Sequence, residues 1–263
     1  PWIFPPMAMP RACNVDTAKA IKTAVGVPVI VAGRLGDPVL AEQVLAEGKA
    51  DLIALGRPLL ADPYLPRKAA EGREEDILPC VSCNACIDRL VRGWSVGCAV
   101  NPALGKEREY QLDRTDRPKK VLVVGGGPAG MEAVLVASRR GHDVVLYEET
   151  RELGGQLLLA SKPSFKKDLV DLLEYLRTQL AKSGVRVELE QDVTAELVRQ
   201  AGADVVIIAT GAEPSKPPIP GMDGQNVATA EAVLRGDCEV GKRVVVAGGG
   251  RLGLEMAWFL SQR

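Results

Sequence analysis

Four of the six cysteines lie close together in the sequence and have the spacing of metal ligands. Cys80, Cys83 and Cys86 stand at every third position, and Cys98 follows after eleven intervening residues. Thiolates bind soft metals, and four cysteine thiolates are the usual ligands of a 4Fe-4S cluster. A structural zinc site more often has two separated C-x2-C pairs, so this spacing favours a cluster, with zinc as the alternative.

A glycine-rich motif, Gly125-x-Gly127-x-x-Gly130, follows the apolar run 121–124. In dinucleotide-binding folds the first glycine makes a tight turn, the second lets main-chain N–H groups approach a pyrophosphate, and the third lets the helix pack on the strand. The helix N-terminus adds partial positive charge. Glu148 lies where an acid would hold ribose hydroxyls. The pattern predicts a dinucleotide site; the alternative is a plain glycine-rich turn.

The motif recurs as Gly248-x-Gly250-x-x-Gly253 after the apolar run 243–247. Two such folds in tandem predict one flavin site and one nicotinamide site, unless the second copy binds nothing. The residue that would distinguish NAD from NADP is expected beyond Arg263.

Two Gly-Arg pairs, Gly33-Arg34 and Gly56-Arg57, each follow a short apolar run. Phosphate sites of (β/α)8 barrels are often built from the loops after the last two strands. Main-chain N–H groups with an arginine suit a phosphate monoester. The alternative is a turn that carries a surface charge.

The elements expected around these motifs alternate between strand and helix. Asp37 and Pro38 suit the cap and first position of a helix. Strands are predicted over 27–32, 51–55, 121–124, 143–147, 185–189, 204–209 and 243–247, and helices over 39–47, 131–140, 165–183 and from 252. This alternation predicts an α/β fold with parallel sheets.

The composition excludes several classes of protein. With 46% hydrophobic and 25% charged residues the chain suits a soluble globular protein. A formal net charge of -1 gives no reason to expect nucleic acid or an anionic membrane as partner. No apolar run is long enough for a membrane span, and the N-terminus has no secretion signal. We therefore expect a cytoplasmic location.

Three stretches together resemble one family. PCVSCNACIDR with CAVNPALGKE, then KKVLVVGGGPAGMEA, then VIIATGAEP are similar to the iron–sulfur branch of the old yellow enzyme family, which includes 2,4-dienoyl-CoA reductase, 2-enoate reductase and trimethylamine dehydrogenase. The resemblance implies the C-terminal part of an FMN-binding (β/α)8 barrel over 1–79, a 4Fe-4S segment over 80–105, a linker over 106–119, a Rossmann-like FAD domain over 120–235 and the start of an NAD(P) domain over 236–263. It also implies a parent protein about two to three times longer.

The resemblance assigns cofactor roles residue by residue. Gly33, Arg34, Gly56 and Arg57 match the FMN-phosphate loops, and Cys80, Cys83, Cys86 and Cys98 match the cluster ligands. Gly125, Gly127, Gly130 and Glu148 match the FAD fingerprint, with Gly155 and Gln156 in the loop beside that cofactor and Thr210 and Gly211 in the second flavin motif. Gly248, Gly250 and Gly253 match the pyridine-nucleotide motif. The family's active-site Tyr and His precede this stretch, so no catalytic residue is assigned.

The implied reaction runs from NAD(P)H through FAD and the cluster to FMN, which reduces an activated C=C bond of an enoyl or dienoyl substrate. Two alternatives stay open. The first is an amine dehydrogenase of the trimethylamine dehydrogenase type with a non-redox ADP site, whose cysteine spacing this sequence resembles. The second is a non-enzymatic, zinc-stabilised nucleotide-binding module. The small-molecule substrate, the choice of NADH or NADPH and the oligomeric state stay open.

Overall fold

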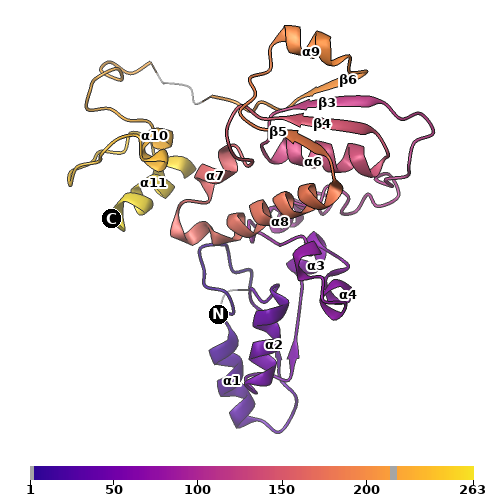
Figure 1. Ribbon diagram of the computed structural model, residues 1–263. Helices are drawn as coiled ribbons and strands as arrows, with labels where there is room; N and C mark the ends of the chain where they lie inside the picture. Colours follow the sequence, from indigo (N-terminus) through magenta and orange to yellow (C-terminus); the bar gives the residue numbers. More distant parts are fainter. Residues whose placement is uncertain (1–2, 214–217) are drawn as a thin grey trace.

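The computed structural model describes residues 3–213 and 218–263. Its N-terminal group of elements contains two short parallel strands (Figure 1). The elements are α1 (Val15–Ala24), β1 (Ile30–Val31), α2 (Pro38–Ala46), β2 (Leu52–Ile53), α3 (Arg57–Ala61), α4 (Leu65–Ala70) and the 3-10 turn η1 (Glu74–Asp76). A small core forms between α1, α2 and the strands and includes Val15, Val31 and Val44. The Asp37 carboxylate accepts from the N–H groups of Val39 and Leu40, so α2 begins as the sequence predicts.

Both N-terminal strands are shorter than the sequence predicts. The expected ranges 27–32 and 51–55 shrink to two residues each. Ile30 and Leu52 lie opposite each other and are 61% and 50% exposed. A strand extends only where a neighbour supplies hydrogen bonds and covers its face, and within the described residues each of these strands has one neighbour.

The cysteine segment follows with one short helix, α5 (Ala85–Val91). From there to residue 119 the chain consists of turns and irregular backbone. The expected linker 106–119 contains neither helix nor strand, which agrees with its apolar-poor composition.

A four-stranded parallel sheet forms the second group. Its strands are β3 (Lys120–Val124), β4 (Asp143–Tyr147), β5 (Arg186–Glu188) and β6 (Val205–Ile208), in the order β5-β4-β3-β6. In sequence order this is 3-2-1-4, the arrangement of a Rossmann half. The strand order therefore reverses between β3 and β6, where ligands bind in such sheets.

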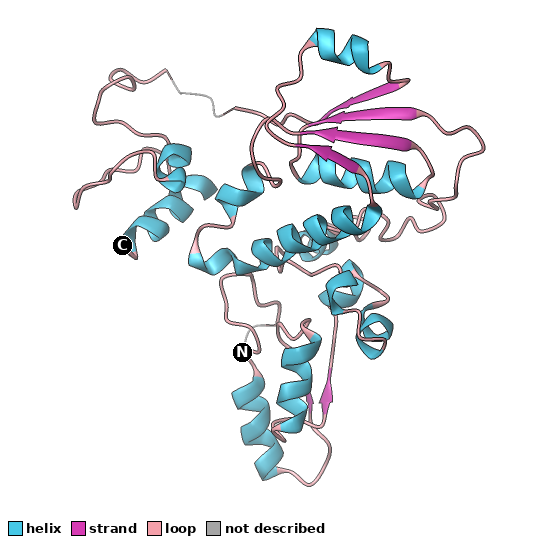
Figure 2. Ribbon diagram, in the orientation of Figure 1, coloured by secondary structure: helices cyan, strands magenta, loops and turns pink. Residues whose placement is uncertain are grey.

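Two helices, α6 (Pro128–Arg139) and α8 (Lys167–Ser183), pack with the sheet to form the main core (Figure 2). Leu173, Leu176 and Leu180 of α8 are buried there, on the face that the sequence predicts to be apolar. The expected helix 165–183 starts instead with a 3-10 turn, η2 (Ser164–Lys166). Among the helices of the described residues, α8 is the longest, and none is both long and apolar enough to cross a bilayer.

The remaining helices are short or lie at the C-terminal end. They are α7 (Gln156–Ala160), α9 (Ala195–Ala201), α10 (Ala230–Arg235) and α11 (Arg251–Ser261). The rings of Phe165 and Trp258 stack with centroids 4.2 Å apart, and Lys166 pairs with Glu255 at 2.5 Å, so α11 docks on η2.

The strand predicted over 243–247 does not form. Val245 in its middle is 93% exposed. A β-strand needs a hydrogen-bonded neighbour, and no other strand of the described chain lies beside this stretch.

Candidate cofactor-binding sites

The four clustered cysteines line one small pocket between α3 and α5. Cys86 stands in the first turn of α5, and Cys98 returns from the loop that follows. Ser82 and Asn84 adopt left-handed φ angles of 49° and 60°. Turns of this kind point main-chain N–H groups into a concavity, as in many iron–sulfur sites.

The main-chain N–H groups of Ser82 and Ile87 lie near the sulfurs of Cys80 and Cys86 and favour the ionised thiols, although the Ile87 N–H donates to the carbonyl oxygen of Asn84 at 3.0 Å. Burial raises the pKa of both thiols, and nearby Arg57 opposes this to a smaller extent. A bound metal would supply the positive charge that favours the thiolates. Four cysteine sulfurs that line one pocket, with Cys86 buried and Cys83 exposed, suit the ligand set of an iron–sulfur cluster.

The sulfurs do not gather around one point. Within 3–213 and 218–263, no three His, Cys, Asp or Glu side chains are arranged to hold a single metal ion. In a 4Fe-4S cluster each thiolate binds a different iron, so a four-sulfur pocket of this kind needs no common centre.

The two Gly-Arg pairs lie at the same edge of the N-terminal sheet. Each follows the carboxyl end of one of two adjacent parallel strands. Among the described residues, no protein acceptor takes the main-chain N–H of Gly33, Arg34 or Gly56. These N–H groups are therefore free to bind an anion.

The side chain of Arg57 faces the cysteine loop. Its Nη2 donates to the carbonyl oxygen of Pro5 at 2.8 Å, and its Nη1 donates to Oδ1 of Asn84. Arg57 also lines the pocket of the four cysteines. This side chain therefore orders the cysteine loop, and contact of its guanidinium with a phosphate stays a prediction.

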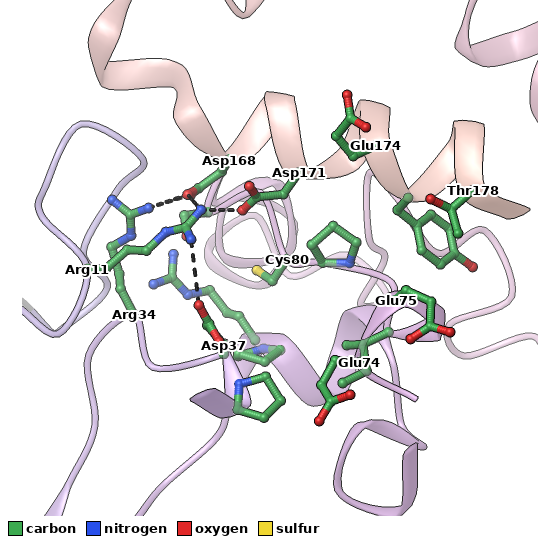
Figure 3. A pocket seen from close by; sticks show the side chains of 18 residues that line it. Arg11, Arg34, Asp37, Glu74, Glu75, Cys80, Asp168, Asp171, Glu174 and Thr178 are labelled. Carbon is green, nitrogen blue, oxygen red and sulfur yellow. Dashed lines mark hydrogen bonds and ion pairs between the residues drawn. The ribbon is translucent and has the colours of Figure 1, made fainter. Parts of the chain in front are cut away.

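Arg34 also has protein partners. Its side chain is 5% exposed, and Nη2 donates to the two carboxylate oxygens of Asp168 at 2.6 and 2.5 Å (Figure 3). Nη1 donates to the carbonyl oxygens of Met7 and Met9. Both Nη atoms thus have protein acceptors, whereas the buried Nε has no hydrogen-bond partner among the described residues. Contact of this side chain with a phosphate stays a prediction.

Asp168 is the residue that motif reading missed. It lies in the first turn of α8 and is 4% exposed. The sequence does carry a signal, because Asp168 precedes Leu172, Leu176 and Leu180 at four-residue steps and so belongs to the apolar face. Because an aspartate is rarely buried without a countercharge, an aspartate on an apolar helix face predicts a buried ion-pair partner.

In the first glycine-rich turn, two glycines are required by close packing. A Cβ on Gly125, whose φ is 105°, would lie 2.4 Å from the carbonyl oxygen of Ala209, and one on Gly130 would lie 1.8 Å from that of Gly125. A Cβ on Gly127 would meet nothing within 4 Å. The turn thus packs on itself and leaves open space beside the N-terminus of α6.

The other predicted residues of this site meet at the same place. The N–H of Gly154 donates to the carbonyl oxygen of Gly126 at 2.9 Å, which seats the loop containing Gly155 beside the turn. The Gln156 side chain donates to the carbonyl oxygen of Ala212 at 2.5 Å. Since Thr210 and Gly211 follow β6, the predicted residues gather where the strand order reverses.

Glu148 is 6% exposed and anchors this turn. Its Oε2 accepts from the N–H of Gly126 at 2.6 Å, and its Oε1 accepts from the N–H and hydroxyl of Thr150 at 2.8 and 2.7 Å. The carboxylate therefore shapes the glycine-rich turn; its contact with a ribose stays a prediction.

The second glycine-rich motif repeats the local geometry of the first. Gly248 has a φ of 123°, and a Cβ on Gly253 would lie 1.9 Å from the Gly248 carbonyl oxygen. Gly250 caps α11 and has open space around it. The turn and helix form here without the strand that precedes them in a complete nucleotide site.

Comparison with known proteins agrees with this division of the chain. Residues 119–263 match the pyridine nucleotide-disulphide oxidoreductase family, and residues 7–76 match the NADH:flavin oxidoreductase / NADH oxidase family. The chain is 42% identical to the cinnamate reductase of Clostridium sporogenes over all of its own length and 39% of that protein. It is 38% identical to the dimethylamine dehydrogenase of Hyphomicrobium, covering 90% of this chain and 35% of that protein.

A solved structure of 2-naphthoyl-CoA reductase superimposes on the chain with a TM-score of 0.93 and 35% identity, covering 98% of this chain and 40% of that one. The chain thus spans about two fifths of the length of these relatives. The superposition covers both groups of elements, so their relative arrangement also corresponds. The matches are to families of oxidoreductases, which speaks against a non-enzymatic nucleotide-binding module. The chain belongs to the iron–sulfur branch of the old yellow enzyme family.

Proposed function

We propose that this chain forms part of an oxidoreductase in which electrons pass from NAD(P)H through FAD and a 4Fe-4S cluster to FMN. The observation that carries the proposal is the position of Cys80. It lines the four-cysteine pocket and also a cavity of about 360 Å3 between the Gly-Arg loops and α8. A soft-metal site between two nucleotide-binding regions is where a one-electron relay would be needed.

The chain's own groups would divide the work of binding. The glycine-rich turn and the N-terminus of α6 would hold the FAD pyrophosphate, and the free N–H groups at 33, 34 and 56 would hold the FMN phosphate. Cys80, Cys83, Cys86 and Cys98 would hold the cluster. When bound, the nicotinamide supplies a hydride and the other groups relay electrons.

The domain boundaries follow from this assignment. We propose a barrel segment over 1–79, a cluster segment over 80–105, a linker over 106–119, an FAD domain over 120–235 and the beginning of an NAD(P) domain over 236–263. We propose a cytoplasmic location, in keeping with free thiols that bind metal.

For the substrate we propose an activated C=C bond of an enoyl or dienoyl compound. The names of two relatives, cinnamate reductase and 2-naphthoyl-CoA reductase, both indicate reduction of conjugated compounds. No catalytic residue is proposed within this chain.

An amine dehydrogenase is the second candidate. It is favoured by the similarity to dimethylamine dehydrogenase and by the spacing of two residues between Cys83 and Cys86. In that case the first nucleotide domain would hold ADP and take no part in electron transfer.

An anaerobic inventory of the purified full-length protein tests these proposals. Iron, acid-labile sulfide, FAD, FMN, ADP and zinc are counted. About four irons with FAD and FMN, and flavin reduced by NAD(P)H, support the reductase. ADP in place of FAD supports the amine dehydrogenase. Zinc without sulfide would overturn the cluster assignment.

A further inference from the structure

The buried ion pair between Arg34 and Asp168 joins two parts of the chain that carry different cofactor motifs. Arg34 belongs to the loop after β1, and Asp168 lies at the start of α8, 134 residues later. Both side chains are 5% exposed. One nitrogen of Arg34, Nη2, contacts both oxygens of the Asp168 carboxylate, which also accepts from Nη2 of Arg11 at 3.1 Å.

On one side the pair continues directly into the Gly-Arg loop. Arg34 is itself part of that loop, next to Gly33, and its Nη1 also holds the carbonyl oxygens of Met7 and Met9. A shift of the guanidinium would therefore move the main-chain N–H groups proposed to hold the FMN phosphate.

On the other side the pair continues through packed helices to the glycine-rich turn. Asp168 stands on α8, whose Leu173, Leu176 and Leu180 share a core with Met131 and Val134 of α6. The glycine-rich turn leads directly into α6. The two proposed flavin sites are thus joined by the charged contacts of Asp168 with Arg34 and Arg11 and by one tightly packed helix pair.

The same pair borders the cavity that also reaches Cys80 (Figure 3). A shift of the Arg34–Asp168 pair would therefore change the distances between the two proposed flavin sites and the proposed cluster. A second contact between α8 and the N-terminal group, Lys182 with Glu75 and Asp76, lies at the far end of the helix and is more exposed. Exposed pairs contribute little to holding a geometry.

We propose that Asp168 is a positioning residue that couples the FAD domain to the FMN-phosphate loop and sets the rate of electron transfer between them. The inference rests on the proposed function. A buried ion pair is a weak source of stability but a specific one, and removing one partner leaves the other charge buried without compensation. Transfer between bound cofactors falls steeply with distance, so a small displacement is sufficient to slow it.

The experiment uses full-length holoenzyme carrying Asp168→Asn. Reduction of FAD by NAD(P)H and the KM for the nicotinamide are expected to stay within about twofold of wild type, whereas kcat through FMN falls about tenfold or more. Glu174→Gln is the matched control, because Glu174 is on the same helix, is 63% exposed, and pairs with Arg177 rather than with either arginine that contacts Asp168. It is expected to leave both rates unchanged.

Asp168→Glu keeps the negative charge and is expected to retain part of the kcat through FMN that Asp168→Asn loses. This variant replaces Asp168→Asn in the experiment if the asparagine variant does not fold. If Asp168 had a purely structural role, Asp168→Asn would lower the unfolding temperature and would slow both the reduction of FAD and the turnover through FMN. That result would overturn the inference. FMN reduction at the wild-type rate in Asp168→Asn would also overturn it. If wild-type enzyme transfers no electrons from NAD(P)H to FMN, the proposed function itself fails, and the coupling fails with it.

Discussion

The glycines of the first nucleotide motif illustrate how one residue type serves two purposes. Gly125 and Gly130 are required by the chain itself, because a Cβ on either would overlap a carbonyl oxygen. A Cβ on Gly127 would meet no protein atom within 4 Å, so packing does not require this glycine, and the proposed pyrophosphate site would explain it. The sequence motif treats the three alike, and only the packing separates them.

Replacing these glycines by alanine separates the two purposes. Gly130→Ala is expected to lower the free energy of unfolding by on the order of 3 kcal/mol, because the added methyl overlaps the Gly125 carbonyl. Gly127→Ala is expected to stay within about 1 kcal/mol of wild type and to weaken FAD or ADP binding by roughly tenfold. Urea unfolding and nucleotide titration check both. Equal destabilisation by the two variants would contradict this assignment.

The cysteines give a second test at single positions. Cys98→Ser is expected to abolish most of the iron and acid-labile sulfide, because a neutral hydroxyl replaces one of four thiolates. Cys238→Ser is the control and is expected to retain about four irons, since this cysteine does not line the four-sulfur pocket. Iron and sulfide are measured after anaerobic reconstitution. A full iron content in Cys98→Ser would show that the fourth ligand lies elsewhere.

At the scale of elements, the pair α6–α8 does more than close the core. Glu132 on α6 and Tyr175 on α8 lie within the packing, and burial raises the pKa of each. For Glu132 the nearby charge of Arg139 opposes the shift without cancelling it. The ionised carboxylate is therefore a cost to the folded state.

Glu132→Gln is expected to raise the urea midpoint at neutral pH. A raised folded-state pKa means that the cost is absent below the unfolded value of about 4.3 and grows as pH rises toward the folded value. The gain from the variant should thus be full at about pH 7 and shrink toward about pH 4.5. Glu174→Gln, whose carboxylate is 63% exposed, is the control with little expected effect. A gain that does not depend on pH would rule out ionisation as its cause.

At the scale of the whole molecule, two comparable motifs reach different states. The turn at Gly125 follows a strand that has neighbours on both sides, β4 and β6. The turn at Gly248 has the same glycine contact but follows an exposed, irregular stretch. Local sequence is sufficient for the turn and the helix, whereas the strand depends on partners that are distant in sequence.

Hydrogen exchange measures this difference directly. In this chain, the amides of 243–247 are expected to exchange at nearly the unprotected rate, while those of Lys120–Val124 exchange only through opening of the whole sheet. Mass spectrometry of peptides from the two stretches checks this. Comparable protection at 243–247 would reveal a strand partner that the described residues do not show.

Much of the nucleotide domain was predictable because its signals are local. The β-branched runs, the glycine spacing and the leucines of α8 predict β3, β4, α6 and α8 to within a few residues. Motif spacing also predicted that Cys80, Cys83, Cys86 and Cys98 hold one cluster; all four line one pocket, and their binding of a cluster stays a prediction. The lengths of β1 and β2 could not be read in this way, since neighbouring strands decide where a strand ends.

The sequence by itself determined the chemical types of the sites: thiols spaced for a cluster, and glycines spaced for two nucleotides. Only the tertiary structure decided which partners the charged side chains take. Arg34 has the spacing of a phosphate ligand, yet it binds an aspartate that lies 134 residues away in the sequence. A local pattern fixes what a side chain can do, whereas burial forces a charge to bind the nearest available countercharge, and the packing of distant elements determines which one that is.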